Sequence, residues 1–500
     1  MRRPRLRSRL SAAAALTFVL ALAAGPVATA GASRSEDCGR SGISCFDALP
    51  ADGSWASAIN LPAVPNRWQG DDVTVASIDT GVMPNADLGD RLLARVDFTD
   101  DHDGIDHFGH GTHMAGLIAG DGSTSDELFQ GAAPEANLVS VKVASWDGAT
   151  DASIVIAALQ WVVSNRARYG IRVVNLSWGT DAVQAADVDP LDAAVERAWR
   201  AGLVVVVSAG NAGPAAGTVT KPGDDPFVIT VGAADTAATV APADDAVASF
   251  SSRGPTSSGN PKPDLLAPGV SMVSDRAPGS TIDTFRADAR LGESLFKGTG
   301  TSQAAAVVSG VVARMIEASP AMSPDQVKAA LTATAGGPLA GADGAGAGLI
   351  DAAAAVNGVA ERFRPVQALP RANSGRALSS ARGTLAGSRG TQPVVVDADG
   401  DGVADPLTGE QDTLGAAWDA PAWAANPWTF GTWARSPWAP LVAEIRGSGP
   451  APAWTGPHAP LMAWEAAYFG ARSAAEAGWD AKYWGAKYWG AKYWGTGAWQ

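Results

Sequence analysis

The chain has 500 residues, of which 46% are hydrophobic and 18% charged, and it carries a formal net charge of −14. This length and composition fit one large domain or a few ordinary ones with buried cores, and they exclude a chain that is disordered throughout. So acidic a chain is a poor partner for nucleic acid or anionic lipid, and we expect neither as a ligand.

Residues 1–32 have the pattern of a secretory signal peptide. Arginines at the start of the chain precede an apolar run at 12–24, and small residues follow at 27–32, as in cleavable export signals. The run is too short to cross a bilayer comfortably and no later apolar stretch is longer, so we expect no transmembrane segment. The pattern predicts a secreted protein, extracellular or associated with the cell surface. In an oxidising exterior, Cys38 and Cys45 are expected to form one structural disulfide.

Residues 73–207 predict an α/β fold with a mostly parallel sheet. Near-continuous apolar or β-branched runs are typical of strands covered on both faces; they occupy residues 73–78, 137–143, 171–176 and 203–207. Between them, residues 152–165 and 191–201 have apolar side chains at helical spacing. Alternating strands and helices imply right-handed crossovers, and functional residues in such sheets gather at the carboxyl ends of the strands.

Two polar residues stand in glycine-lined turns within the first part of this region. Asp79 ends the first predicted strand and precedes Gly81, a pattern that is also ordinary turn chemistry. His110 lies in a glycine-containing segment with two other histidines, at 107 and 113. Their spacing allows a metal site, but steps of three residues drift around a helix and the glycines favour a loop, so we do not favour metal binding here.

Two further polar residues follow in similar turns. Asn211 comes after the strand predicted at 203–207; it is either a left-handed turn residue or a side-chain amide that faces a developing negative charge. Ser302 ends a glycine-rich loop and begins an Ala/Val-rich helix, where it is either an N-cap or a nucleophile. A carboxylate, an imidazole, an amide and a hydroxyl are the groups that hydroxyl attack on a carbonyl requires.

These segments resemble the four signature blocks of the subtilisin-like serine proteases, in that family's order. The blocks are Asp79-Thr80-Gly81, His110-Gly111-Thr112-His113, Ala209-Gly210-Asn211 and Gly300-Thr301-Ser302. The resemblance extends over residues 50–358, and it implies a three-layer α/β/α catalytic domain, which we place at residues 33–358.

The resemblance also implies the chemistry of the site. Ser302 attacks a peptide carbonyl, His110 is the general base and Asp79 orients it, so that hydrolysis proceeds through an acyl-enzyme. Asn211 and the main-chain N–H of Ser302 form the oxyanion hole. Polypeptide substrates are expected to bind along Ser177, Trp178 and Gly179, with Ala209 and Gly210 as a pocket wall; Trp178 either narrows a pocket or packs in the core. The chemistry requires no cofactor.

One departure from the family pattern lies next to the predicted nucleophile. Gln303 stands where the family usually has methionine. Because this residue is not part of the triad, we expect the reaction to be unchanged and the floor of the pocket to differ.

The composition changes after residue 358. Residues 359–392 are rich in Arg, Ala, Gly and Ser and predict a linker. Aspartates then alternate with other residues at Asp397, Asp399, Asp401 and Asp405. This pattern resembles the start of a calcium loop, but Thr408 stands where such loops place glutamate, so structural calcium and a plain acidic turn both remain open.

Residues 393–500 form a tail in which tryptophan recurs every five residues. Twelve of the 18 tryptophans lie between Trp418 and Trp499. Period five fits neither a helix nor a simple strand and predicts a repeating turn or coil with stacked rings. Three roles stay open for the tail: binding to glycan or cell wall, packing on its own catalytic domain, and a low-complexity stalk.

Two functions from different classes follow. The first is a secreted serine endopeptidase. The second is a surface protein with an inactive protease domain that acts through glycan or cell-wall binding by the tail. The presence of Asp79, His110, Asn211 and Ser302 together favours the first. The sequence predicts no oligomeric state.

Overall fold

The computed structural model describes residues 54–447, without residue 240 and residues 361–369, 392–393 and 397–404. The predicted signal peptide, Cys38, Cys45 and the tryptophans from Trp454 onward lie outside the described residues. The disulfide and the role of the second tryptophan series therefore remain predictions.

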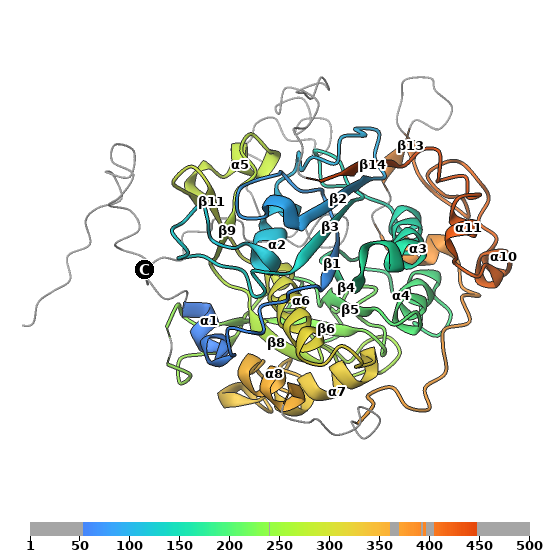
Figure 1. The fold of residues 1–500 in the computed structure, drawn as a ribbon. Coiled ribbons are helices and arrows are strands. Elements are labelled where there is room, and N and C mark those ends of the chain that lie inside the picture. The colour runs from blue at the N-terminus through green and yellow to red at the C-terminus, as the bar shows by residue number, and fades with distance from the viewer. Residues whose placement is uncertain (1–53, 240, 361–369, 392–393, 397–404, 448–500) are drawn as a thin grey trace, which may run out of the picture. The chain divides into compact units, whose positions relative to one another are not determined.

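A nine-stranded sheet forms the centre of the described chain, in the order β14-β2-β3-β1-β4-β5-β6-β7 with β8 paired to β6 (Figure 1). The strands are β1 (Thr74–Asp79), β2 (Leu92–Asp97), β3 (Asn137–Lys142), β4 (Ile171–Leu176), β5 (Val204–Ser208), β6 (Ile229–Asp235), β7 (Ala246–Val247), β8 (Leu265–Pro268) and β14 (Ala443–Arg446). Only the pairs β14–β2 and β6–β7 are antiparallel among these described strands. The predicted mostly parallel α/β sheet is confirmed.

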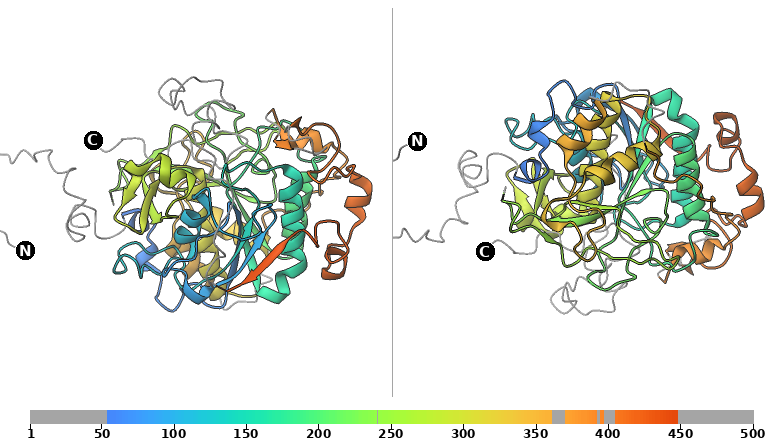
Figure 2. Two further views of the ribbon diagram at one scale, coloured as in Figure 1. Left: turned by 90° about the horizontal axis from the view of Figure 1, so that it is seen from above. Right: turned by 90° about the horizontal axis from the view of Figure 1, so that it is seen from below.

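Helices cover both faces of this sheet, as its buried strands require. The helices α2, α6, α7 and α8 lie on one side, and α3 and α4 lie on the other (Figure 2). The longer helices are α2 (His110–Ala119), α3 (Ala152–Tyr169), α4 (Pro190–Arg200), α6 (Thr301–Ala318), α7 (Pro324–Thr334) and α8 (Ala352–Ala360). Short turns of helix are α1 (Ser54–Ala58), η2 (Leu61–Ala63), η3 (Gly89–Arg91), α5 (Thr281–Phe285), η4 (Ala287–Ala289) and η5 (Gly337–Leu339). A second, three-stranded antiparallel sheet contains β9 (Met272–Asp275), β10 (Arg290–Leu291) and β11 (Leu295–Gly298).

Local sequence sets the ends of the helices on the α3/α4 face. The side chain of Asp151 accepts from the N–H of Ser153 and caps α3, and α3 ends at Gly170, which has a φ of 66°. Asp189 caps α4 in the same way, and Pro190 follows at the first helical position. Each cap satisfies main-chain donors that the first turn of a helix leaves without a partner.

Residues 370–391, which belong to the predicted linker, are bonded to α4 and α3. The N–H of Ser379 donates to Glu196 at 2.6 Å. The short helix α9 (Leu385–Arg389) follows, and Arg389 forms an ion pair with Asp151 at 2.7 Å. Both side chains of this pair are at least 96% buried. This part of the chain therefore packs on the same domain as the helices that it contacts.

Residues 405–447, which we name the C-terminal strap, run over α3 and α4 to the edge of the sheet (Figure 1). Their elements are β13 (Asp405–Pro406), which pairs with β12 (Val395–Val396), then α10 (Ala420–Ala425), α11 (Phe430–Trp433) and β14. At its end, β14 pairs with β2 so that Ala443 lies opposite Asp97 and Arg446 opposite Ala94. Glu444 accepts from both Arg168 and Tyr169 of α3.

The first tryptophan series lies in this strap and packs on the domain. Neighbouring rings contact one another, with centroids 5.4 Å apart for Trp418 and Trp423 and 5.5 Å apart for Trp423 and Trp428. The guanidinium of Arg197 from α4 lies over the rings of Trp423 and Trp428. Trp433 and Trp438 contact Phe98, which follows β2. All five tryptophans therefore pack on their own domain, and the first three also contact one another in sequence order.

Among the described residues, no helix combines the length and the apolar character that crossing a membrane would require.

Candidate active site

Asp79 is the last residue of β1, at the carboxyl end of the sheet. Its side chain is 1% exposed, and its Oδ1 lies 2.8 Å from both the N–H of Thr80 and Nδ1 of His110. Burial raises the pKa of Asp79, and the interaction with His110 opposes that rise. The turn that follows needs Gly81, which has a φ of 110° and whose missing Cβ would lie 2.9 Å from the carbonyl of Ile105.

His110 begins α2, whereas the glycines around it had favoured a loop. Gly109 has a φ of 110°, where glycine carries no steric penalty, and it leads directly into the helix. A Cβ on Gly111 would lie 2.1 Å from the carbonyl oxygen of Gly81. Gly111 therefore belongs to the helix and lets its first turn approach Asp79.

Asp106 fixes this first turn and was not identified from the sequence. Its carboxylate is fully buried; it accepts from Gly109 N at 2.6 Å, Thr112 N at 2.7 Å, Thr112 Oγ1 at 2.7 Å and Thr80 Oγ1 at 2.8 Å. Thr80 Oγ1 in turn accepts from Gly111 N at 2.9 Å. An aspartate shortly before a glycine-led helix is a capping signal, and it would have indicated this role.

The three neighbouring histidines have three different partners. Nε2 of His107 lies 2.8 Å from Asp103, and Nε2 of His113 lies 3.2 Å from the carbonyl oxygen of Met272. Burial lowers the pKa of His113 to about 3, so this side chain is neutral at physiological pH. Their partners give the three rings separate structural environments, which does not favour the metal alternative.

Ser302 lies in the first turn of α6, as predicted. Its hydroxyl donates to the main-chain oxygen of Ser177 at 3.2 Å, and the Ser177 hydroxyl donates to the main-chain oxygen of Ser302 at 3.3 Å. Ser302 therefore lies against the carboxyl end of β4. Because β1, β4 and β5 are neighbouring parallel strands, their carboxyl ends lie at the same edge of the sheet.

Asn211 follows β5 and contacts the same helical turn. Its Oδ1 accepts from both the N–H and the hydroxyl of Thr301, each at 2.9 Å. Thr301 Oγ1 accepts from Gly210 N at 3.1 Å. These bonds fix the orientation of the Asn211 side chain, with Oδ1 on the side of Thr301.

The predicted substrate-binding residues flank Thr220, which the sequence did not single out. A Cβ on Gly179 would lie 2.6 Å from Oγ1 of Thr220, and a Cβ on Gly210 would lie 2.8 Å from its Cγ2. The main-chain N–H of Thr220 donates a hydrogen bond to the carbonyl oxygen of Ala209 at 3.0 Å. Trp178 is 1% exposed and packs in the hydrophobic core. Thr220 thus fills the space between the two glycines.

Gln303 is completely buried next to Ser302. Within the described part of the chain, neither Oε1 nor Nε2 of its amide has a hydrogen-bond partner. An amide buried in this way lowers stability, because it loses its bonds to water without replacement.

The candidate calcium ligands are largely outside the described residues. Asp397, Asp399 and Asp401 are among those not described, and Asp405 begins β13 without a described side chain. Calcium binding there stays a prediction.

A carboxylate bonded to an imidazole, with a serine in the first turn of a helix beside an asparagine, is the group set of a serine hydrolase. The chain belongs to the subtilase family, whose profile matches residues 70–364. It is 42% identical over 265 residues to "Serine protease AprX" of Bacillus subtilis (strain 168), an alignment that covers 52% of this chain and 60% of that protein. The chain thus matches less than two thirds of the length of that relative.

Other relatives match over nearly their whole length. "Subtilisin Savinase" of Lederbergia lenta is 33% identical over 300 residues, which are 60% of this chain and 96% of that protein. The solved structure of "Sphericase" shares 26% identity and a TM-score of 0.48, covering 58% of this chain and 91% of the other.

Proposed function

We propose that this protein is a secreted serine endopeptidase. Membership of the subtilase family supports the class of reaction. The observation that carries the assignment is the 2.8 Å contact between Asp79 Oδ1 and His110 Nδ1, at the same edge of the sheet as Ser302. The export pattern of residues 1–32 supports secretion.

In the proposed reaction, the Ser302 hydroxyl leaves the Ser177 carbonyl and attacks a peptide carbonyl while Nε2 of His110 takes its proton. Asp79 holds the imidazole in the tautomer that has its proton on Nδ1 and stabilises the imidazolium that forms. The peptide nitrogen leaves with the proton from His110, and water then hydrolyses the acyl-enzyme. His113 takes no part, because it stays neutral and faces Met272.

The amide of Asn211 and the N–H of Ser302 are proposed to donate to the oxyanion. Two features support this role. The bonds from Thr301 fix Oδ1 of Asn211, and Nδ2 is the donor of the amide. The N–H of Ser302 belongs to the first turn of α6, where main-chain donors have no partner within the helix.

The extended substrate is proposed to pair with the chain at Ser177, Trp178 and Gly179, as an added strand. Thr220 lies where a side chain between Gly179 and Gly210 would enter. We therefore infer a shallow pocket that favours a small residue, such as alanine, on the acyl side of the cleaved bond.

A serine-reactive fluorophosphonate probe tests the assignment. We expect labelling of the purified protein and none of Ser302→Ala. Ser309→Ala is the matched control, since Ser309 lies on the same helix, is fully buried and bonds Asn175; it should label like the wild type. If Ser302→Ala labels as strongly as the wild type, the enzyme assignment fails and the surface-protein alternative gains support.

A further inference from the structure

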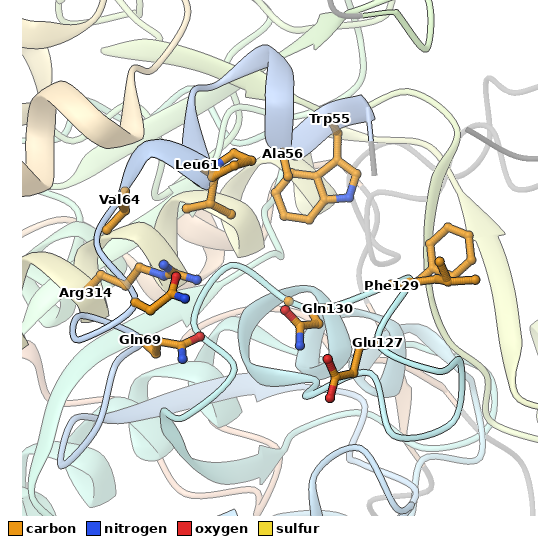
Figure 3. Close-up of a pocket in the computed structure, with 13 residues that line it drawn as sticks. Trp55, Ala56, Leu61, Val64, Gln69, Glu127, Phe129, Gln130 and Arg314 are labelled. Atoms are coloured by element: carbon orange, nitrogen blue, oxygen red, sulfur yellow. The ribbon is translucent and has the colours of Figure 1, made fainter. Parts of the chain in front are cut away.

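A second pocket lies at the far ends of the helices that carry His110 and Ser302. It is formed by the loop that follows α2, by the chain around α1 and η2, and by Arg314 on α6 (Figure 3). Its volume is about 310 Å³, near the lower end of small-molecule sites. Arg314 lies twelve positions after Ser302 on α6, or about 18 Å along the helix, so the pocket is distinct from the active site. Its lining includes Trp55, Ala56, Leu61, Glu127, Gln130 and Arg314.

Arg314 presents the terminal nitrogens of its guanidinium to this pocket (Figure 3). The residue is 7% exposed, and its Nε donates to the carbonyl oxygen of Ala132 at 2.5 Å. Among the described residues, neither of its terminal nitrogens has a hydrogen-bond partner. Burial lowers the pKa of Arg314 to about 10, with Glu317 and Glu135 opposing, so the group is still cationic at neutral pH. A buried cation with free N–H groups favours an anion with paired oxygens.

The two carboxylates that raise the pKa of Arg314, those of Glu317 and Glu135, accept hydrogen bonds from other groups. Oε2 of Glu317 accepts from Gly70 N at 2.6 Å, and Oε1 of Glu135 accepts from the Gln69 amide at 3.4 Å. They lower the local positive potential without forming an ion pair with Arg314. The two terminal nitrogens of the Arg314 guanidinium are therefore available to a ligand.

The opposite side of the pocket is acidic, and another part of its wall is apolar. Glu127 lies across from Arg314, with Gln130 between them, while Trp55 and Leu61 lie above (Figure 3). Glu127 is exposed, so its charge is screened and orients a ligand more than it binds one. A ligand that matches these groups has a carboxylate that binds Arg314, an ammonium on the side of the ligand that faces Glu127, and an apolar side chain.

We propose that this pocket binds a free hydrophobic α-amino acid, with its carboxylate on the terminal nitrogens of Arg314, its ammonium toward Glu127 and its side chain against Trp55 and Leu61. The small volume favours a single amino acid over a longer peptide. The binding does not depend on the peptidase activity.

Calorimetric titration of the full chain with L-phenylalanine tests the proposal. L-phenylalaninamide lacks the carboxylate and 3-phenylpropanoate lacks the ammonium, so both should bind more weakly than phenylalanine. Arg314→Met should weaken phenylalanine binding about tenfold to a hundredfold, the range for losing a hydrogen-bonded charge. Ala56→Phe keeps Arg314 and fills the pocket, so it should abolish binding.

Arg172→Met is the matched control. Arg172 is half-buried and, like Arg314, donates to main-chain carbonyl oxygens, those of Pro320 and Met322, but it does not line the pocket. It should bind phenylalanine like the wild type. The proposal is overturned by absence of saturable heat with phenylalanine, by equal binding of the amide or the propanoate, or by wild-type binding in Ala56→Phe.

Discussion

The ion pair between Arg389 and Asp151 is expected to hold residues 370–391 on the domain. Arg389 donates from Nε to Asp151 Oδ2 at 2.7 Å and from Nη1 to the carbonyl oxygen of Gly409 at 2.6 Å, and it also bonds the carbonyl of Gln411. Asp151 keeps its cap to Ser153 through Oδ1, but Oδ2 has no other partner among the described residues. Arg389→Ala therefore leaves a buried carboxylate oxygen without a cation.

The expected loss is about 3–5 kcal/mol in the free energy of unfolding, as for a broken buried pair. Urea unfolding followed by tryptophan fluorescence measures it, in a Ser302→Ala background that prevents self-digestion. Arg389→Lys keeps the charge but not the fork, and should fall between the wild type and Arg389→Ala.

Arg446→Ala is the control, because that side chain is 73% exposed and lies 3.5 Å from Glu444. Its effect should stay within about 0.5 kcal/mol. A loss below about 1 kcal/mol for Arg389→Ala, with the control unchanged, would refute the reasoning that this pair secures the segment.

Four further predictions concern the site and the helices around it. Asn211→Leu should lower kcat on a peptide substrate by about 10²–10³-fold, the size known for loss of such a donor in a relative, with KM nearly unchanged; a kcat within tenfold of wild type would remove Asn211 from the oxyanion hole. Gln303→Met should raise the free energy of unfolding by about 1–3 kcal/mol, because it removes a buried amide without partners; an unchanged midpoint in urea contradicts this. Burial next to Asp225 raises the pKa of Glu196 above its ordinary 4.5, so the folded state keeps a proton that the unfolded state loses, and stability falls as pH rises above that value. Glu196→Gln should abolish this fall in melting curves taken from pH 5 upward, and a parallel fall in the variant counts against it. Thr220→Gly should raise kcat/KM for substrates with phenylalanine before the cleaved bond relative to alanine, and an unchanged ratio means that Thr220 does not limit the pocket.

Residues whose position in the fold follows from local pattern could be placed from the sequence. Asp79, Asn211 and Ser302 follow apolar runs or precede an apolar helix, and a parallel sheet brings such positions to one edge. The runs that became β1, β3, β4 and β5 are buried on both faces, so composition alone identified them. The contact between Asp79 and His110 then followed from family order.

Strand β2 shows why other elements could not be predicted from the sequence. Its sequence contains Arg95 and Asp97, both fully buried, where charged residues normally indicate an exposed segment. Asp97 is tolerated because it accepts from Thr99, Asp103 N and Gly104 N. Burial raises its pKa, and Lys142 opposes the rise. Such compensation depends on residues that approach only in the fold.

The position of the strap was equally hidden. The five-residue spacing of its tryptophans predicted contact between neighbouring rings, but not the surface on which they pack. That surface depends on Arg197 of α4, which the sequence alone would place at an exposed position. Its guanidinium donates to the carbonyl oxygen of Asn426 at 2.9 Å and lies over the rings of Trp423 and Trp428. A partner so distant in sequence leaves no local signal.

The pairing of β14 with β2 has a consequence for the order of folding. Strand β2 is synthesised early, yet it can pair with β14 only after residues 443–446 have been synthesised. Until then, β2 presents an open row of main-chain donors and acceptors, the kind of edge on which other chains assemble. Pairing two strands so far apart in the sequence is slow, since the entropic cost of closing the chain must be met before the contacts form. A nascent or truncated form of this enzyme that lacks the strap should therefore aggregate through that edge before it loses its helices.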